Sequence, residues 1–240
     1  IEGTVTTAIS YVRVMEETAR EQIRRMCSYD LTEGSRVRIM PDVHAGKGCT
    51  IGTTMTIVDK AVPNVVGVDI GCGMYTIDLG RQPIDFFRLD KAAHRVPSGA
   101  NVWNEPQLSF DVHPLYCYDR LKNLSRIACS IGTLGGGNHF IEVDETHDGR
   151  HYLIIHTGSR NLGKQVADIY QQIAIELQGQ EETQPEQINR IIREYQMAGR
   201  QEEIEKSVKE IKRRYHQKQI PDDLCYVSGK YLKQYLHDVV

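Results

Sequence analysis

The chain has 240 residues, of which 40% are hydrophobic and 25% charged, and its formal net charge is −3 at pH 7. This length and composition allow a sizeable core, and we expect one interlocked domain over residues 1–240. No signal peptide and no apolar run long enough to span a bilayer is found, which argues against a secreted or integral membrane protein. Because the net charge is not basic, any contact with nucleic acid must depend on a local patch. Candidates for this patch are Lys47, Arg81, Arg160 and Lys164.

Six cysteines are spread along the chain without any C-x-x-C pair. In a chain of this length without a secretion signal they are typical of reduced thiols rather than of a disulfide framework. The sequence therefore predicts a cytoplasmic protein.

The first half of the chain predicts one helix followed by short strands. Apolar residues recur at helical spacing between Ser10 and Cys27, which indicates a helix there. Short β-branched segments then alternate with Gly and Pro, a pattern of mixed sheet rather than of regular βαβ units. The expected strands are Val37–Met40, Thr53–Val58, Val65–Asp69 and Met74–Leu79.

The second half of the chain is more helical. Residues 98–112 have the composition of an irregular loop, and further elements follow it. We expect a helix over Tyr116–Cys129, a strand over Leu153–His156 and a helix over Leu162–Leu177.

A charged helical hairpin is predicted over about residues 185–219. Two apolar stripes fall at helical spacing, and Ala198 and Gly199 form the break between them. The stripes are Ile188, Ile192 and Tyr195, then Ile204, Val208, Ile211 and Tyr215. Because the charges of the hairpin are mixed in sign, packing of one stripe on the core is favoured over an RNA clamp. The fold class predicted for the whole chain is α+β, with mixed β-sheets, flanking helices and a C-terminal helical hairpin.

Three segments end apolar runs with glycines and side chains that bind metals. VVGVDIGCGM carries Asp69 and Cys72, GTLGGGNHFIEV carries His139, and IIHTGSR carries His156. A thiolate, two imidazoles and a carboxylate favour a first-row transition metal over Ca or Mg, although Zn remains open. An open set of three or four ligands suits catalysis better than a closed Cys₄ site. The alternative is that Asp69-x-x-Cys72 is a buried thiol beside a turn carboxylate.

The glycine run of the second segment, Gly132 to Gly137, allows backbone N–H groups to approach an anion such as a nucleotide phosphate. It lacks the Gly-Lys-Ser/Thr ending of a P-loop, and a tight turn is the alternative. The polar residues Asn138, His139 and Glu142 directly behind it favour the anion site.

A third glycine-rich stretch, Met40 to Met55, is typical of a loop. It holds an acid, an imidazole and a cation within six positions: Asp42, His44 and Lys47. Lys47 could receive a phosphate, and all three could equally be exposed loop residues.

The motifs PDVHAGKG, VGVDIGCGM, GTLGGGNHFIEV and HTGSRNLG occur together in this order. In this the chain resembles the RtcB family of RNA-splicing ligases, from about Val37 to Val240. The resemblance implies an RtcB-like fold and a GTP- and Mn²⁺-dependent RNA ligase of tRNA splicing or RNA repair. Such an enzyme joins RNA 3′-phosphate or 2′,3′-cyclic phosphate ends to 5′-hydroxyl ends.

Site residues are implied by the same resemblance. Asp69, Cys72, His139 and His156 would hold two Mn²⁺ ions, with the Cys72 thiolate bridging them and Zn²⁺ or Co²⁺ as possible substitutes. Asp42 resembles a family acid near the reacting RNA end. The guanine-nucleotide site would be lined by Asn138, His139, Phe140, Ile141 and Glu142.

Members of this family are longer than the present chain. Their nucleotidylated histidine, a further metal-binding histidine and a lysine that contacts the nucleotide lie C-terminal to Val240. We therefore expect a single RtcB-like domain truncated at its C-terminus, which by itself does not ligate, because ligation proceeds through a histidine–GMP intermediate. Two other functions stay open: a metal-dependent phosphoesterase acting on RNA ends, and a non-catalytic RNA- or nucleotide-binding module. An activating protein partner is also left open.

Overall fold

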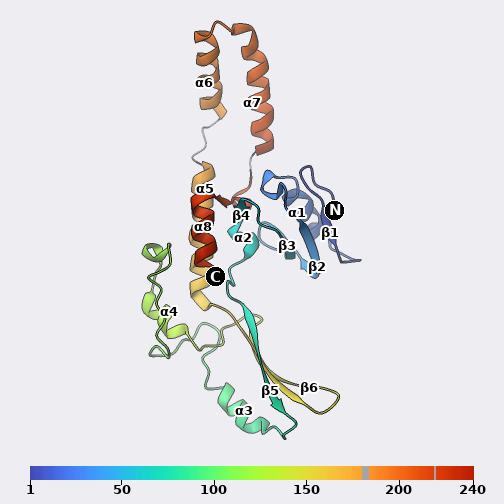
Figure 1. Cartoon of the computed structure of the whole chain (residues 1–240), viewed down its shortest axis with the longest axis vertical. Coiled ribbons are helices and arrows are strands. Elements are labelled where there is room, and N and C mark those ends of the chain that lie inside the picture. Colours follow the sequence, from blue (N-terminus) through green and yellow to red (C-terminus); the bar gives the residue numbers. More distant parts are fainter. Residues whose placement is uncertain (180–183, 219) are drawn as a thin grey trace. The chain divides into compact units, whose positions relative to one another are not determined.

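The computed structural model describes residues 1–179, 184–218 and 220–240. The chain divides into two compact units, and the elements of both are labelled in Figure 1. The first unit contains Ile1–Val65 and Gln171–Gly229, and the second contains Val66–Tyr170 and Lys230–Val240. Helices are combined with small mixed and antiparallel sheets, which confirms the predicted α+β class. The organisation as one domain stays a prediction.

The core of the first unit lies under a three-stranded sheet. Its order is β1-β2-β3, with β1 parallel and β3 antiparallel to β2. Val37 and Ile39 are fully buried on one face of β2, where Ile23 and Met26 of helix α1 join them. Alternation along a strand sends the residues between them to the opposite face. The bounds are β1 (Ala8–Ser10), α1 (Glu17–Met26), β2 (Val37–His44) and β3 (Ile51–Met55).

The predicted helical hairpin also belongs to the first unit. Helices α6 (Gln184–Met197) and α7 (Ile204–Lys218) contact each other and lie side by side in Figure 1. Gly199 adopts the left-handed conformation at the break between them. Residue 219 and the side chain of Tyr215 lie outside the described residues. The remaining elements are η1 (Asp30–Thr32), β4 (Lys60–Ala61), α2 (Pro63–Val66), η3 (Gln201–Glu203), η4 (Asp222–Leu224) and β8 (Val227–Ser228).

An antiparallel sheet in the order β5-β7-β6 organises the second unit. Its register aligns Met74, His156 and Phe140 in one row across the three strands. The strands are β5 (Gly73–Gly80), β6 (Phe140–Glu145) and β7 (His151–Thr157). The helices are α3 (Phe86–Ala93), η2 (Tyr118–Arg120), α4 (Leu124–Ser130), α5 (Arg160–Gly179, in this unit up to Tyr170) and α8 (Gly229–Asp238, in this unit from Lys230).

A buried carboxylate anchors α8 within this unit. Asp238 accepts hydrogen bonds from the Tyr170 hydroxyl at 2.7 Å and from the backbone N–H groups of Tyr116 and Cys117 at 2.9 and 3.0 Å. The ring of His237 lies 3.0 Å from the same carboxylate. Burial by itself would raise the pKa of Asp238, but these hydrogen bonds outweigh it and lower the pKa. The carboxylate is therefore held in its charged form.

For the first half of the chain, one predicted helix is confirmed over a shorter range, and one predicted strand was wrong. The helix expected over Ser10–Cys27 begins only at Glu17, because the chain before it pairs with β2 through main-chain bonds such as Tyr11 N–H to the Ile39 carbonyl. The strand expected over Val65–Asp69 is absent. Pro63 instead starts the short helix α2, as proline favours the first helical turn, and Gly67 then turns the chain at positive φ.

The helix expected over Tyr116–Cys129 is interrupted. Asn123 adopts the left-handed conformation, with φ of 56°, and separates η2 from α4. Throughout residues 1–179, 184–218 and 220–240, each helix is too short or too polar to serve as a membrane span.

Candidate metal centre

Asp69 and Cys72 lie in a turn that leads into β5. The Cys72 N–H donates to the Asp69 carbonyl at 3.1 Å, and Gly71 between them has a positive φ of 74°. This backbone conformation is readily available only to glycine. The turn presents a carboxylate and a thiol together at the start of the strand, where the sequence predicted continuous strand up to Asp69.

Two histidines reach this turn from the neighbouring strands. The Nε2 atom of His139, directly before β6, lies 3.2 Å from Asp69 Oδ2. The Nε2 atom of His156, on the central strand β7, lies 2.9 Å from Cys72 Sγ. The two imidazole rings are in edge contact, with centroids 5.4 Å apart. The structure thus brings all four predicted metal ligands together.

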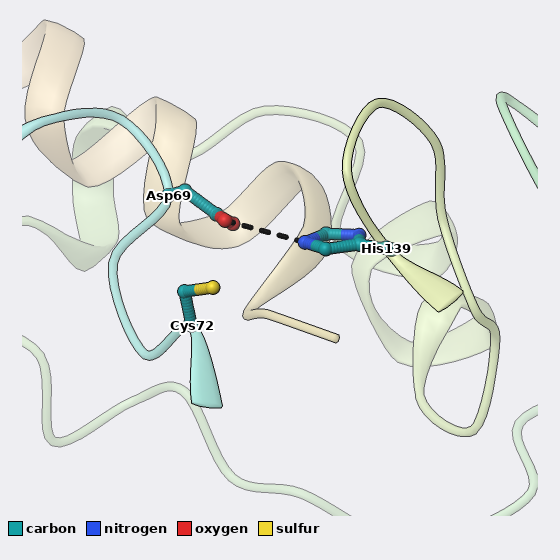
Figure 2. A group of neighbouring side chains, drawn as sticks. All are labelled: Asp69, Cys72 and His139. Carbon is teal, nitrogen blue, oxygen red and sulfur yellow. Dashed lines mark hydrogen bonds and ion pairs between the residues drawn. The ribbon is translucent and has the colours of Figure 1, made fainter. Parts of the chain in front are cut away.

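Three of these ligands form the tightest group. One donor atom each from Asp69, Cys72 and His139 lies within 4.8 Å of the other two. Figure 2 shows the Asp69 carboxylate directed at the His139 ring, with the Cys72 sulfur beside this contact. A single cation could be reached by all three.

The orientation of His156 suits a ligand. Its Nδ1 atom lies 3.0 Å from the Asn138 carbonyl oxygen, to which it can donate a hydrogen. This contact directs Nε2 to the cluster and favours the tautomer with an Nε2 lone pair. The His139 side chain is only 5% exposed, and its Nδ1 atom is buried without a hydrogen-bond partner in the described residues.

Glycines leave the space in which these groups pack. A Cβ atom on Gly158 would overlap the Asp69 carboxylate. One on Gly135 would overlap the Arg160 guanidinium and lie 2.6 Å from His139 Nδ1. Arg160 donates to Thr133 Oγ1 at 3.2 Å and to a backbone carbonyl, so that the glycine run and the start of α5 hold each other.

The electrostatics favour a bound cation. Desolvation and the nearby Asp69 carboxylate raise the pKa of the Cys72 thiol to about 11. At neutral pH the sulfur is therefore protonated unless a positive charge replaces the proton. The Asp69 side chain is 41% exposed, which leaves the cluster open on that side. A carboxylate, a thiol and two imidazoles around an open position fit a first-row transition metal.

The residues predicted to line a nucleotide site lie along β6. Phe140 packs edge-on against the His156 ring, with centroids 5.2 Å apart, and Ile141 is opposite Ile155 of β7. Asn138 and Glu142 are exposed. Asn138 thus orients the His156 ring through its carbonyl and is exposed to solvent.

Asp42 lies outside this cluster, in the first unit. The stretch from Met40 to Met55 is not one loop as expected, because β2 continues to His44 and β3 begins at Ile51. Asp42 is an exposed strand residue whose carbonyl oxygen is 2.8 Å from the His44 ring. A role of Asp42 at a reacting RNA end stays a prediction.

Most cations proposed from the sequence for an RNA patch already have acidic neighbours. Lys47 lies 4.0 Å from Asp223, Arg81 binds Asp148 at 2.6 Å, and Lys164 pairs with Asp168. Arg160 is engaged by the glycine run. Two features were not predicted from the sequence: the orientation of His156 by the Asn138 carbonyl, and the close packing of Gly158 against Asp69. In the sequence, the only signal for them was their position beside His139 and His156.

Comparison with known proteins supplies a family match. A family model described as tRNA-splicing ligase RtcB matches residues 22–111 and 117–219. The RNA-splicing ligase RtcB of Escherichia coli K12 is 31% identical over 162 residues, and that of Mycobacterium tuberculosis is 32% identical over 185 residues. The tRNA-splicing ligase RtcB of Aeropyrum pernix is 29% identical over 189 residues.

These alignments include 58%, 53% and 55% of the present chain, respectively. They cover 40%, 43% and 39% of the relatives. The chain therefore matches about two fifths of the length of each relative.

Proposed function

Because the chain belongs to the RtcB family of tRNA-splicing ligases, we propose that it is the metal-binding portion of an RNA ligase. The substrates would be RNA 3′-phosphate or 2′,3′-cyclic phosphate ends and 5′-hydroxyl ends, with GTP and two Mn²⁺ ions as cofactors. The observation that carries the proposal is the convergence of Asp69, Cys72, His139 and His156 at the ends of three strands.

Four side chains would share the proposed site. Asp69 with its carboxylate, Cys72 with its sulfur, and His139 and His156 with their imidazole nitrogens would hold the two ions. The ions would neutralise charge on phosphoryl oxygens, which lowers the barrier to displacement at phosphorus. The Asn138 carbonyl keeps the His156 ring oriented, and the packing at Gly135 keeps Arg160 close to the same site.

The nucleotide would lie against the residues after the glycine run. Gly135 and Gly137 have positive φ, which lets successive backbone N–H groups face a phosphate. Asn138 and Glu142, both exposed, would contact the guanine nucleotide, and Asp42 the reacting RNA end. The histidine that carries GMP in this mechanism would be supplied from outside the chain. A cytoplasmic location would keep Cys72 in its thiol form.

A chimera provides the test of this proposal. The segment of this chain matched by the family model would replace the corresponding segment of the Escherichia coli ligase. We expect the chimera to join labelled RNA ends in GTP and Mn²⁺, and the same chimera with Cys72→Ala to lose joining by more than about 100-fold, since it lacks a direct metal ligand.

The 240-residue chain alone serves as the second arm. We expect it to bind Mn²⁺ but to form no labelled protein with α-labelled GTP. A chimera that folds by circular dichroism yet joins equally well with Cys72→Ala would contradict the proposal. Release of phosphate from RNA ends by the chain alone would favour the phosphoesterase instead.

A further inference from the structure

The open face of the β1-β2-β3 sheet carries two arginines that the metal centre does not use. Arg36 and Arg38 alternate along the strand with the buried residues Val37 and Ile39, so they project from the face opposite to the core. With two residues of β3 and the residue that follows it, they line an open groove of about 320 Å³. The other lining residues are Thr54, Met55 and Thr56.

Neither guanidinium has an acidic partner among the residues that the structure describes. Within the ranges that the structure describes, no carboxylate lies at salt-bridge distance from Arg36 or Arg38. Arg38 instead turns its Nη1 atom back to the Val37 carbonyl at 2.9 Å. Two unneutralised cations two residues apart on one strand repel each other. An anion bound between them would remove this repulsion.

Two exposed side chains of the β1 segment lie on the other side of β2 from β3. Ile9 of β1 is directly opposite Arg38 and is 48% exposed. Tyr11 follows two residues later, is 61% exposed, and keeps the pairing with β2 through its N–H bond to the Ile39 carbonyl. Guanidinium groups combined with an exposed aromatic ring can bind both the phosphates and the bases of a single strand.

We propose that this groove, named here the Arg36/Arg38 groove, binds the phosphate backbone of single-stranded RNA. The inference rests on the proposed function, because it assigns a contact surface for the RNA substrate of that reaction. Residues two apart in a strand are separated by about 6.6 Å, so the two guanidinium groups can contact adjacent phosphates of one strand. The Thr56 hydroxyl accepts from the Arg36 N–H at 2.8 Å and keeps its own hydrogen for a phosphate oxygen, and Tyr11 offers a stacking surface for a base.

Salt-dependent RNA binding tests the groove. The 240-residue chain and its Arg36→Gln/Arg38→Gln variant would be titrated against a fluorescein-labelled oligouridylate between about 50 and 200 mM salt, by fluorescence anisotropy. Loss of two phosphate contacts on a single strand should lower the slope of log K against log salt by about 1.4. We expect affinity at low salt to fall by about ten-fold or more.

Two further variants separate charge from structure. Arg36→Lys/Arg38→Lys keeps the charge and should keep the salt slope. Arg20→Gln/Arg24→Gln removes the same charge from α1 in the same unit, where both arginines pair with glutamates, and should leave RNA binding nearly unchanged. Circular dichroism would confirm that each variant is folded.

The titrations are run with a chelator and without GTP, so they do not depend on the metal centre. A groove variant that binds RNA like the α1 variant would overturn the inference while the chimera still tests the ligase. The same variants would also be titrated with labelled poly-glutamate. If the groove variant kept its RNA affinity but no longer bound poly-glutamate, the inference would be overturned in favour of an acidic protein partner. A lower slope of log K against log salt in the Arg36→Gln/Arg38→Gln variant, but not in the α1 variant, would support the inference even if the chimera failed to join RNA.

Discussion

Two aspartates of the second unit, Asp69 and Asp238, occupy opposite kinds of environment. Asp238 is buried, and its two oxygens accept from a tyrosine hydroxyl and two backbone N–H groups with a histidine ring beside them. Asp69 is 41% exposed and its carboxylate contacts a single imidazole and a thiol whose pKa it raises. A carboxylate with a full set of donors stabilises a fold, whereas one that faces other ligand atoms is available to a cation. The same residue type therefore occupies two environments, which its partners distinguish.

The largest expected effect is the loss of metal binding when a side chain next to Asp69 is removed. Cys72→Ala should abolish tight binding of Mn²⁺ or Zn²⁺, lowering affinity by more than about 100-fold, because it removes the sulfur that lies next to both His156 and Asp69. Metal content would be measured by mass spectrometry after extensive dialysis. Cys129→Ala, a buried cysteine of α4 in the same unit, is the matched control and should retain metal. Equal metal stoichiometry in Cys72→Ala and the parent chain would remove the basis of the site.

For Asp238 we expect a loss of stability rather than a loss of metal. Asp238→Ala should lower the free energy of unfolding by about 3 kcal/mol, because it leaves buried donors of Tyr170, Tyr116 and Cys117 without an acceptor. Urea denaturation would measure it. Asp69→Ala should lose metal and keep its stability without metal. If Asp69→Ala were the more unstable of the two variants, the division of roles would be wrong.

A smaller effect concerns pH. The pKa of Asp238 is lower in the folded state than its unfolded-state value of about 3.9. The carboxylate therefore stabilises the fold fully above this pH, and the stabilisation is lost as the pH falls through the lower, folded-state pKa. The free energy of unfolding should thus decrease with acid below about pH 4 more steeply in the parent chain than in Asp238→Asn. Urea titrations across this range test it. Parallel pH profiles would show that the hydrogen bonds do not favour the charged form.

The residue types of the candidate metal centre could be predicted from the sequence, and their geometry could not. Asp69, Cys72, His139 and His156 follow apolar runs and stand beside glycines, which marks them as candidates. Their contacts depend on the register of β5, β7 and β6, and on the turn from Asp69 to Cys72, which follows a segment that was wrongly predicted as strand. Propensity is local, whereas register is decided by pairing between segments distant in the chain.

Two other features depend on long-range contacts and escaped prediction. Asp238 meets Tyr116 across 122 positions, so no local pattern identifies it as a buried acceptor. Arg36 and Arg38 alternate with apolar residues, but only the pairing of β2 with β3 shows which face they share with Thr54 and Thr56. By contrast, the hairpin of α6 and α7 was predictable because its stripes and its break are local.

The order of the sheet in the second unit has a mechanical consequence. Cys72 immediately precedes one edge strand, His139 the other, and His156 is on the strand between them, with 84 positions separating Cys72 from His156. An ion held by these side chains would link all three strands of the sheet. Peeling either edge strand away from the centre would then require a metal–ligand bond to break, so loss of the ion and opening of the sheet would occur as one event.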